Sequence, residues 1–227
     1  MISKHDVRKS KLCARLDQKP EVIHSKTKKI NREVWNLIEY FKPDILLSYM
    51  AFGSEIHIGN VMDKAIKLGI EIYIPRVEGK NMSFYRYYGK ESTSSGFKGI
   101  LEPDNQERFI YDPSDALKVL MIMPGVAFDI DRGRVGYGGG FYDRYLQDKK
   151  GILTAAICYD CQLSDELIEL EPTDIRPDIV ITEERVLSSG VIKIKNEDIK
   201  NDDIGNEEGG YYVRSYQFIR ESKDSLS

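Results

Sequence analysis

The chain has 227 residues, of which 41% are hydrophobic and 31% are charged, a composition typical of globular proteins and not of disordered or fibrous ones. Its net charge of -4 and isoelectric point of about 5.6 argue against a general nucleic-acid-binding protein but are compatible with a local cationic pocket. Three cysteines do not suggest a disulfide framework, no apolar run is long enough to span a membrane, and residues 1–10 lack the apolar core of a secretory signal. We therefore expect a cytoplasmic protein that binds neither nucleic acid nor membrane.

Hydrophobic spacing predicts alternating helices and strands. In chain order we expect a helix over 4–17, a helix over 20–42, a strand over 44–49, a helix over 60–68, strands over 71–75, 81–87 and 118–123, a helix over 141–149, and strands over 153–159 and 178–182. The strand–helix–strand order favours right-handed parallel crossovers. The expected fold is α/β with three layers, in which helices flank a mostly parallel sheet that carries a small antiparallel extension.

The character of the sequence changes towards its end. Residues 196–210 are acidic and rich in Asn and Gly, and residues 211–220 contain aromatic side chains without a clear period. We therefore expect an α/β domain over residues 1–190 and a C-terminal appendage of unknown role over residues 191–227.

The densest signal in the sequence is a glycine-rich turn, residues 131–144. Glycine lets backbone N–H groups approach an anion closely, and successive N–H groups form an anion-binding nest. Arg132, Arg134 and Arg144 add forked donors suited to phosphate. Asp143 lies within this cationic region and could hold Mg²⁺ together with phosphate oxygens. The turn therefore predicts a site for the phosphate tail of a nucleotide and a divalent metal.

Two features have ordinary alternative interpretations. The turn matches neither the GxGxxG of dinucleotide-binding folds nor the GxxxxGK[ST] of P-loops, and a flexible connection between a strand and a helix is the alternative. Cys158 and Cys161 form a Cys-x-x-Cys pair. We interpret them as two ordinary thiols at the end of a strand, because the other ligands of a structural zinc site are missing.

The turn belongs to a longer pattern that resembles the signature of 5-formyltetrahydrofolate cyclo-ligases, also called 5,10-methenyltetrahydrofolate synthetases. The matching segments are Lys4-x-x-x-Arg8, Ser54-Glu55, Ile74-Pro75-Arg76, Met82-x-Phe84, Gly99-Ile100-x-Glu102-Pro103, residues 124–129, residues 133–144, Asp178 and Thr182-Glu183. The resemblance covers roughly residues 4–185. Lys98 departs from the pattern, because an aromatic residue often stands there in the family. Either Phe97 substitutes for that residue or Lys98 meets the glutamate tail of the substrate.

The resemblance implies an ATP-dependent ligase of one-carbon metabolism that converts 5-formyltetrahydrofolate to 5,10-methenyltetrahydrofolate and releases ADP and phosphate. In the implied route, the γ-phosphoryl group moves to the formyl oxygen, N10 attacks the activated carbon, and phosphate leaves. Such chemistry asks mainly for positioning and charge neutralisation from the protein. The implied cofactors are ATP and Mg²⁺, the implied partner is the small-molecule substrate, and we expect a monomer or a weak homodimer.

The resemblance also implies roles for individual residues. Arg134 and Tyr142 are expected to be catalytic, and Asp143 and Asp178 to hold Mg²⁺. The residues expected to bind ATP are Lys4, Arg8, Arg134, Gly136, Gly138, Gly139, Gly140, Phe141 and Tyr142. Those expected to bind the folate are Glu55, Met82, Gly99, Ile100, Glu102 and Tyr142.

Three alternatives remain open at this point. Glu55 could instead be an N-cap or first-turn acid of the helix over residues 60–68. The chain could be a non-catalytic folate- or nucleotide-binding member of the same fold. It could also be an interaction protein in which residues 196–227 carry the main role.

Overall fold

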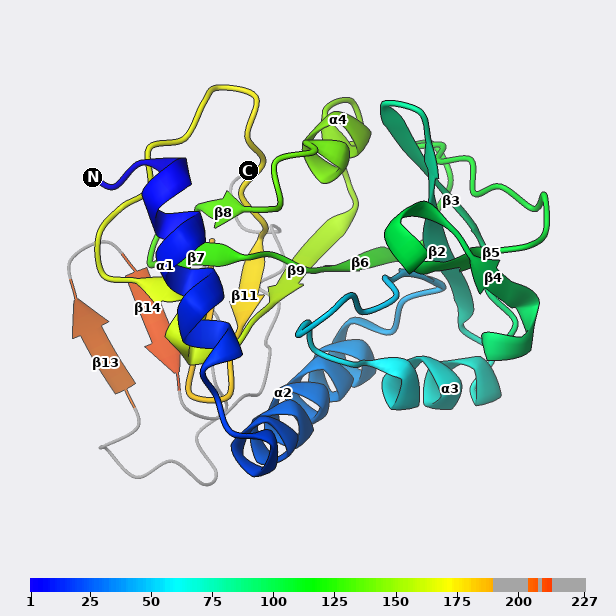
Figure 1. Ribbon diagram of the computed structural model, residues 1–227. Helices are drawn as coiled ribbons and strands as arrows, with labels where there is room; N and C mark the ends of the chain where they lie inside the picture. Colours follow the sequence, from blue (N-terminus) through cyan, green and yellow to red (C-terminus); the bar gives the residue numbers. More distant parts are fainter. Residues whose placement is uncertain (190–203, 208–209, 214–227) are drawn as a thin grey trace, which may run out of the picture.

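A computed structural model describes residues 1–189, 204–207 and 210–213 (Figure 1). Its main sheet has nine strands, in the spatial order β13 (Ile204–Glu207), β14 (Gly210–Val213), β12 (Val186–Ser188), β11 (Ile179–Ile181), β9 (Leu153–Ile157), β6 (Val119–Met123), β1 (Ile45–Leu47), β2 (Glu71–Glu78) and β3 (Asn81–Arg86). The five strands from β11 to β2 are mutually parallel, and antiparallel strands extend the sheet at both edges. The predicted parallel sheet with an antiparallel extension at residues 81–87 is thereby confirmed.

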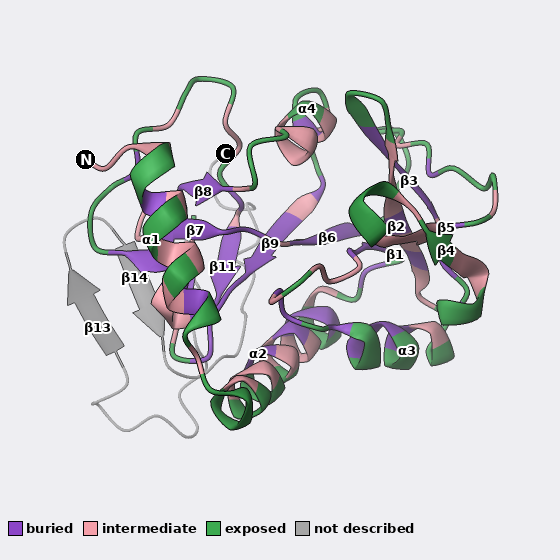
Figure 2. Ribbon diagram, viewed as in Figure 1, coloured by how far each residue is buried: buried purple, intermediate pink, exposed green. Residues whose placement is uncertain are grey.

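Helices cover the sheet on both faces and bury two apolar cores. The helices α2 (Pro20–Phe41) and α3 (Gly59–Lys67) lie on one face, and α4 (Phe141–Leu146) packs on the other (Figure 1). Strand β6 is apolar on both faces, because its side chains alternate between the two cores. Leu120 and Ile122 pack in the core under α2 and α3, while Val119, Met121 and Met123 pack in the core under α4. Figure 2 shows the central strands β6, β9 and β11 mostly buried, whereas the outer sides of α2 and α3 are exposed. The predicted three-layer α/β architecture is confirmed.

A small second sheet lies beside the first and supports the N-terminal helix. It consists of β10 (Leu163–Ser164), β7 (Ala127–Asp129) and β8 (Arg134–Val135), and α1 (Lys4–Leu16) packs against it through Val7. Ser3 caps α1 by accepting a hydrogen bond from the backbone N–H of Asp6 at 3.2 Å. This sheet was not predicted, because strands of two or three residues are too short to show a period.

A third sheet forms a hairpin at the opposite end of the molecule. Strands β4 (Thr93–Ser95) and β5 (Leu101–Pro103) are joined by the short 3₁₀ helix η2 (Phe97–Gly99), and a second such helix, η1 (Lys90–Ser92), precedes them. We call residues 93–103 the flap. The remaining element, η3 (Asp160–Gln162), follows β9.

The predicted helices and strands agree with the structure to within a few residues, except that β2 runs three residues further than expected and α4 ends three residues earlier. The predicted appendage, 191–227, lies mostly outside the described residues, apart from β13 and β14. No helix among the residues with described structure is long and apolar enough to cross a bilayer.

Candidate functional site

A cavity of about 750 Å³ lies where the parallel strands β1, β2 and β6 end. Tyr49 follows β1, Pro75 and Val77 lie on the outer half of β2, and Pro124-Gly125 follows β6. The carboxyl ends of parallel strands are the usual position for ligands in open α/β sheets. Helix α1, the flap and the glycine-rich turn close the remaining sides.

Helix α1 brings two cations to the cavity. Lys4 and Arg8 are four residues apart and therefore lie on one face of the helix, and both line the cavity as predicted. The ammonium group of Lys4 lies 2.5 Å from a carboxylate oxygen of Asp174 and 3.4 Å from one of Glu171. Burial is the largest single effect on Lys4 and opposes its charge, but the hydrogen bonds and negative charges of Asp174 and Glu171 together outweigh it and raise the pKa of Lys4.

The second cation on α1 faces the turn. Arg8 donates a hydrogen bond through Nε to the carbonyl oxygen of Gly136 at 2.8 Å. The turn bends through left-handed glycines, with φ of 96° at Gly138 and 62° at Gly140, a conformation that side chains disfavour. The terminal nitrogens of Arg8 and the backbone of the turn therefore face the same part of the cavity.

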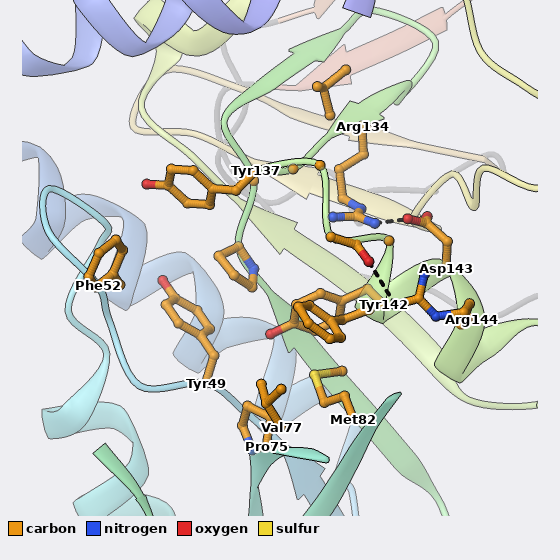
Figure 3. A pocket seen from close by; sticks show the side chains of 18 of the residues that line it. Tyr49, Phe52, Pro75, Val77, Met82, Arg134, Tyr137, Tyr142, Asp143 and Arg144 are labelled. Atoms are coloured by element: carbon orange, nitrogen blue, oxygen red, sulfur yellow. Dashed lines mark hydrogen bonds and ion pairs between the residues drawn. The ribbon is translucent and has the colours of Figure 1, made fainter. Parts of the chain in front are cut away.

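Arg134 lies at the start of the turn with its side chain almost fully buried. One terminal nitrogen forms an ion pair with the carboxylate of Asp143 at 2.9 Å (Figure 3). Within the described residues its Nε has no hydrogen-bond partner. A buried donor without a partner costs free energy, on the order of 1–3 kcal/mol, so a ligand oxygen that satisfies it would bind favourably.

The predicted metal ligands are not brought together. Asp143 lines the cavity, whereas Asp178 does not. The carboxylate of Asp178 instead accepts hydrogen bonds from the backbone N–H and the hydroxyl of Thr154, each at 2.8 Å, which fixes the start of β11 against β9. Arg132, which the sequence assigned to phosphate, also lies outside the cavity, because its guanidinium group donates to the carbonyl oxygens of Pro177 and Ser188.

The floor of the cavity is apolar and aromatic. Figure 3 shows Tyr142 between Tyr49 and Met82, while Phe52 and Tyr137 form the opposite wall. Burial raises the pKa of the Tyr142 hydroxyl well above its ordinary value, so this group stays protonated and can donate a hydrogen bond at neutral pH. This surface has the character of a binding site for a flat, largely apolar group.

Glu55 supplies a carboxylate beside this floor. It lies in the turn after β1, is 8% exposed, and accepts a hydrogen bond from the backbone N–H of Phe52 at 2.9 Å. Burial raises its pKa, while the bond from Phe52 and the nearby Arg15 partly oppose that shift. The alternative role as a cap of α3 is wrong, because the N-cap residue of that helix is Ile58.

The flap provides the remaining predicted residues. Ile100 and Glu102 line the cavity as expected, whereas Gly99 does not. Glu102 accepts a hydrogen bond from the backbone N–H of Val77 at 3.1 Å, which ties the flap to β2. Phe97 packs edge-on against Phe141, with ring centroids 6.3 Å apart, and so brings the flap into contact with the turn.

Several residues of the site had no signal in the sequence. Glu171 and Asp174 hold Lys4 from a loop without a recognisable motif. Arg15 is 2% exposed and donates to Ser54 Oγ at 2.8 Å and to the hydroxyl of Tyr137 at 2.5 Å. It thereby joins α1 to the Glu55 loop and to the turn. In the sequence, the helical spacing of such an arginine makes it look like one more charge on an exposed helix face.

The fold and the site together define an α/β protein whose cavity joins a cationic, glycine-rich anion site to an aromatic floor. The model of the 5-formyltetrahydrofolate cyclo-ligase family matches residues 1–183. This chain belongs to that family.

Individual relatives agree with this assignment. The chain is 29% identical over 180 residues to a probable 5-formyltetrahydrofolate cyclo-ligase of Schizosaccharomyces pombe, covering 73% of this chain and 88% of the relative. It is 32% identical over 143 residues to the 5-formyltetrahydrofolate cyclo-ligase of Escherichia coli strain K12, covering 61% of this chain and 77% of that enzyme.

Solved structures have the same fold. The 5,10-methenyltetrahydrofolate synthetase of Aquifex aeolicus superposes with a TM-score of 0.70 at 29% identity, covering 86% of this chain and 97% of that one. A synthetase from Mycoplasma pneumoniae superposes with a TM-score of 0.63 at 22% identity, covering 80% and 99%, and supports the fold alone.

Proposed function

We propose that this chain catalyses the ATP-dependent cyclisation of 5-formyltetrahydrofolate to 5,10-methenyltetrahydrofolate, with release of ADP and phosphate. The observation that carries the proposal is the joining, in one cavity, of a cationic glycine-rich turn and an aromatic floor beside a buried carboxylate. A triphosphate suits the first half, and a reduced pteridine suits the second. Phosphoryl transfer between two bound ligands needs both in contact, which a single cavity allows.

The nucleotide phosphates are proposed to bind to Lys4, Arg8 and Arg134 and to the backbone of the turn. In the part of the chain that the structure describes, the only hydrogen bond of the Arg8 guanidinium is made by Nε, and the Nε of Arg134 has no partner, so these groups can donate to a ligand. These groups fit a polyanion, because forked guanidinium donors neutralise phosphate charge and hold it in a fixed orientation.

Magnesium is proposed to bind through Asp143 and the phosphate oxygens. No group of three acidic, His or Cys side chains capable of holding a metal occurs in the described part of the chain. A single carboxylate from Asp143 together with phosphate oxygens fits Mg²⁺, which commonly takes one or two carboxylates and completes its shell with phosphate and water. Asp143 uses Oδ1 for Arg134 and for the backbone N–H of Ile175, and no hydrogen bond to its Oδ2 occurs within the described residues. When bound, the metal would neutralise charge on the transferring phosphoryl group.

The folate is proposed to bind over Tyr142 and Met82, with Glu55, Ile100 and Glu102 around it. Glu55 offers the ring system an acceptor, and Tyr142 offers a donor where the two ligands meet. Arg134 next to Tyr142 supplies fixed positive charge near the transfer.

The test is the absorbance of the methenyl product under single-turnover conditions with the folate, Mg²⁺ and ATP, and again without ATP. We expect product only with ATP. In Asp143→Ala, we expect turnover to be lost while the circular dichroism spectrum is unchanged. Asp148→Ala is the matched control, because Asp148 is an exposed acid just after α4 that does not line the cavity. Normal turnover in Asp143→Ala would refute the metal assignment.

The alternative is a non-catalytic member that binds the ligands without turning them over. It predicts retained binding of the folate with no change in absorbance.

We further propose that residues 1–190 form the catalytic domain, that the protein is a cytoplasmic monomer or weak homodimer, and that residues 191–227 are an appendage outside the reaction. Size-exclusion chromatography with light scattering measures the oligomeric state.

A further inference from the structure

Arg15 is a cation to which the proposed reaction gives no role. It lies near the end of α1, is 2% exposed and does not line the cavity. Among the residues that the structure describes, no carboxylate forms an ion pair with its guanidinium group. A charge without an ionic partner is costly to bury. The position of Arg15 therefore indicates a role other than contact with a ligand or an exposed ion pair.

Three neutral oxygens surround this guanidinium group instead. Its Nε donates to Oγ of Ser54 at 2.8 Å, and one terminal nitrogen donates to the hydroxyl of Tyr137 at 2.5 Å. The other terminal nitrogen donates to the carbonyl oxygen of Gly125 at 3.4 Å. A guanidinium group is planar and holds its donors in fixed directions. One side chain therefore sets the relative positions of three segments that are distant in the sequence.

Two of these segments belong to different halves of the cavity. Ser54 lies in the loop over residues 48–58, between β1 and α3, beside the proposed folate ligand Glu55. Tyr137 lies in the glycine-rich turn, which is proposed to bind the nucleotide. Within the described residues, no hydrogen bond runs directly from the loop to the turn. Phe52 packs edge-on against Tyr137, with ring centroids 6.1 Å apart (Figure 3). The guanidinium group thus supplies the hydrogen-bonded connection between the two halves.

We infer that Arg15 is a positioning residue, which holds the folate half and the nucleotide half of the cavity in the relative position that phosphoryl transfer requires. The inference rests on the proposed function. Each ligand contacts mainly its own half, so a shift between the halves would leave both binding affinities nearly unchanged. The formyl oxygen and the γ-phosphoryl group would nevertheless move apart. A displacement of about 1 Å between reacting groups can lower a rate on the order of 100-fold.

The test is the steady-state kinetics of Arg15→Met, which keeps a long side chain but removes the charge and the donors. We expect kcat to fall by about tenfold or more, while the KM for ATP and the KM for the folate each stay within about threefold of the wild type. A contribution to the binding of one ligand would instead raise the KM for that ligand. A loss of stability alone would lower the folded fraction, measured by circular dichroism, and leave kcat per folded molecule unchanged. Either of these results would overturn the inference.

Arg15→Lys separates the geometry of the donors from the charge. Its compact ammonium group keeps the charge but cannot bond Ser54 and Tyr137 in the fixed directions of a guanidinium group. We therefore expect its kcat to stay near that of Arg15→Met, and recovery of the wild-type kcat would contradict a positioning role. The control is Lys9→Met, which alters an exposed lysine of α1 outside the cavity and should behave as the wild type.

Two milder variants decide the question if Arg15→Met does not fold. Tyr137→Phe and Ser54→Ala each remove one acceptor at a position that is not buried, so the fold should tolerate them. Each should lower kcat several-fold with both KM values unchanged.

Where Arg15→Met folds, adding Tyr137→Phe to it should cause no further loss of kcat, because the bond between the two side chains is already absent. If neither milder variant lowers kcat, or if the losses multiply in the double variant, the inference is wrong although the proposed function stands. If the wild type makes no methenyl product, the proposed function fails and the inference fails with it.

Discussion

Replacing Gly133 with alanine should lower the free energy of unfolding without altering the cavity. A β-carbon at this position would lie 2.4 Å from Oδ2 and 3.0 Å from Oδ1 of Asp129. Asp129 is completely buried and cannot move freely, because Oδ1 accepts from the backbone N–H of Gly133 at 2.7 Å and Oδ2 accepts from that of Ile168 at 2.8 Å. The new methyl group must therefore displace a carboxylate that holds two segments together.

The magnitude follows from those two bonds. A hydrogen bond to a charged group contributes about 1.5–3 kcal/mol, and a buried carboxylate left short of a donor adds a penalty. Loss of one bond and weakening of the other predicts a decrease of roughly 3 kcal/mol in the free energy of unfolding. The φ of Gly133 is not positive, so backbone strain does not contribute.

The assay is urea unfolding followed by circular dichroism, with the free energy taken from the midpoint and slope. Gly59→Ala is the control, because nothing lies within 4 Å of a β-carbon at Gly59, which is the first residue of α3. Alanine there should leave stability unchanged or raise it by up to about 1 kcal/mol. A value for Gly133→Ala within about 0.5 kcal/mol of the wild type, the usual range for neutral surface changes, would show that Asp129 yields and that the reasoning is wrong.

Arg8→Gln should raise the KM for ATP about tenfold with little effect on the KM for the folate, because a charge-assisted contact to phosphate is lost. The control is Lys9→Gln, which alters an exposed neighbour on α1 and should change neither constant. A larger effect of Arg8→Gln on the KM for the folate would contradict the assignment. Burial raises the pKa of Glu55 above its ordinary value of 4.5, so the native state binds this proton more tightly than the unfolded state and stability declines as pH rises above 4.5. Glu55→Gln should flatten that part of the pH–stability curve measured by thermal unfolding, and an unchanged curve would argue against a buried carboxylate. A chain ended after Ser189 should retain ATP-dependent turnover, and its loss would show that the later residues serve the reaction.

The sequence predicted those elements that bury a long, regular apolar face. Helix α2 and strand β6 have this property, since Val34, Leu37 and Ile38 recur at helical spacing and residues 119–123 are apolar throughout. The strands of two or three residues in the flap and in the small sheet gave no comparable signal. They are held by contacts with distant segments, such as Val77 with Glu102, which local patterns do not encode.

The candidate site was predictable where its residues lie in one continuous motif. Most residues predicted to bind the nucleotide or the folate line one cavity, and Gly99 does not. Asp178 was assigned to metal from the resemblance to the family, and its position could not test that assignment, because an acid at the start of a strand looks the same in the sequence whether it faces a cavity or bonds to a neighbouring strand. Its partner, Thr154, lies 24 residues away, and only the folded sheet shows which of the two roles it has.

Helix α1 imposes an order on the maturation of the site. It is synthesised before the turn, because the carbonyl oxygen that Arg8 contacts belongs to a residue 128 positions later. At roughly 5–20 residues per second, that interval is on the order of ten seconds. A helix of 13 residues is only marginally stable in water by itself, so α1 gains its full stability when it docks. The phosphate-binding site therefore cannot form until the turn has been synthesised and α1 has docked against it.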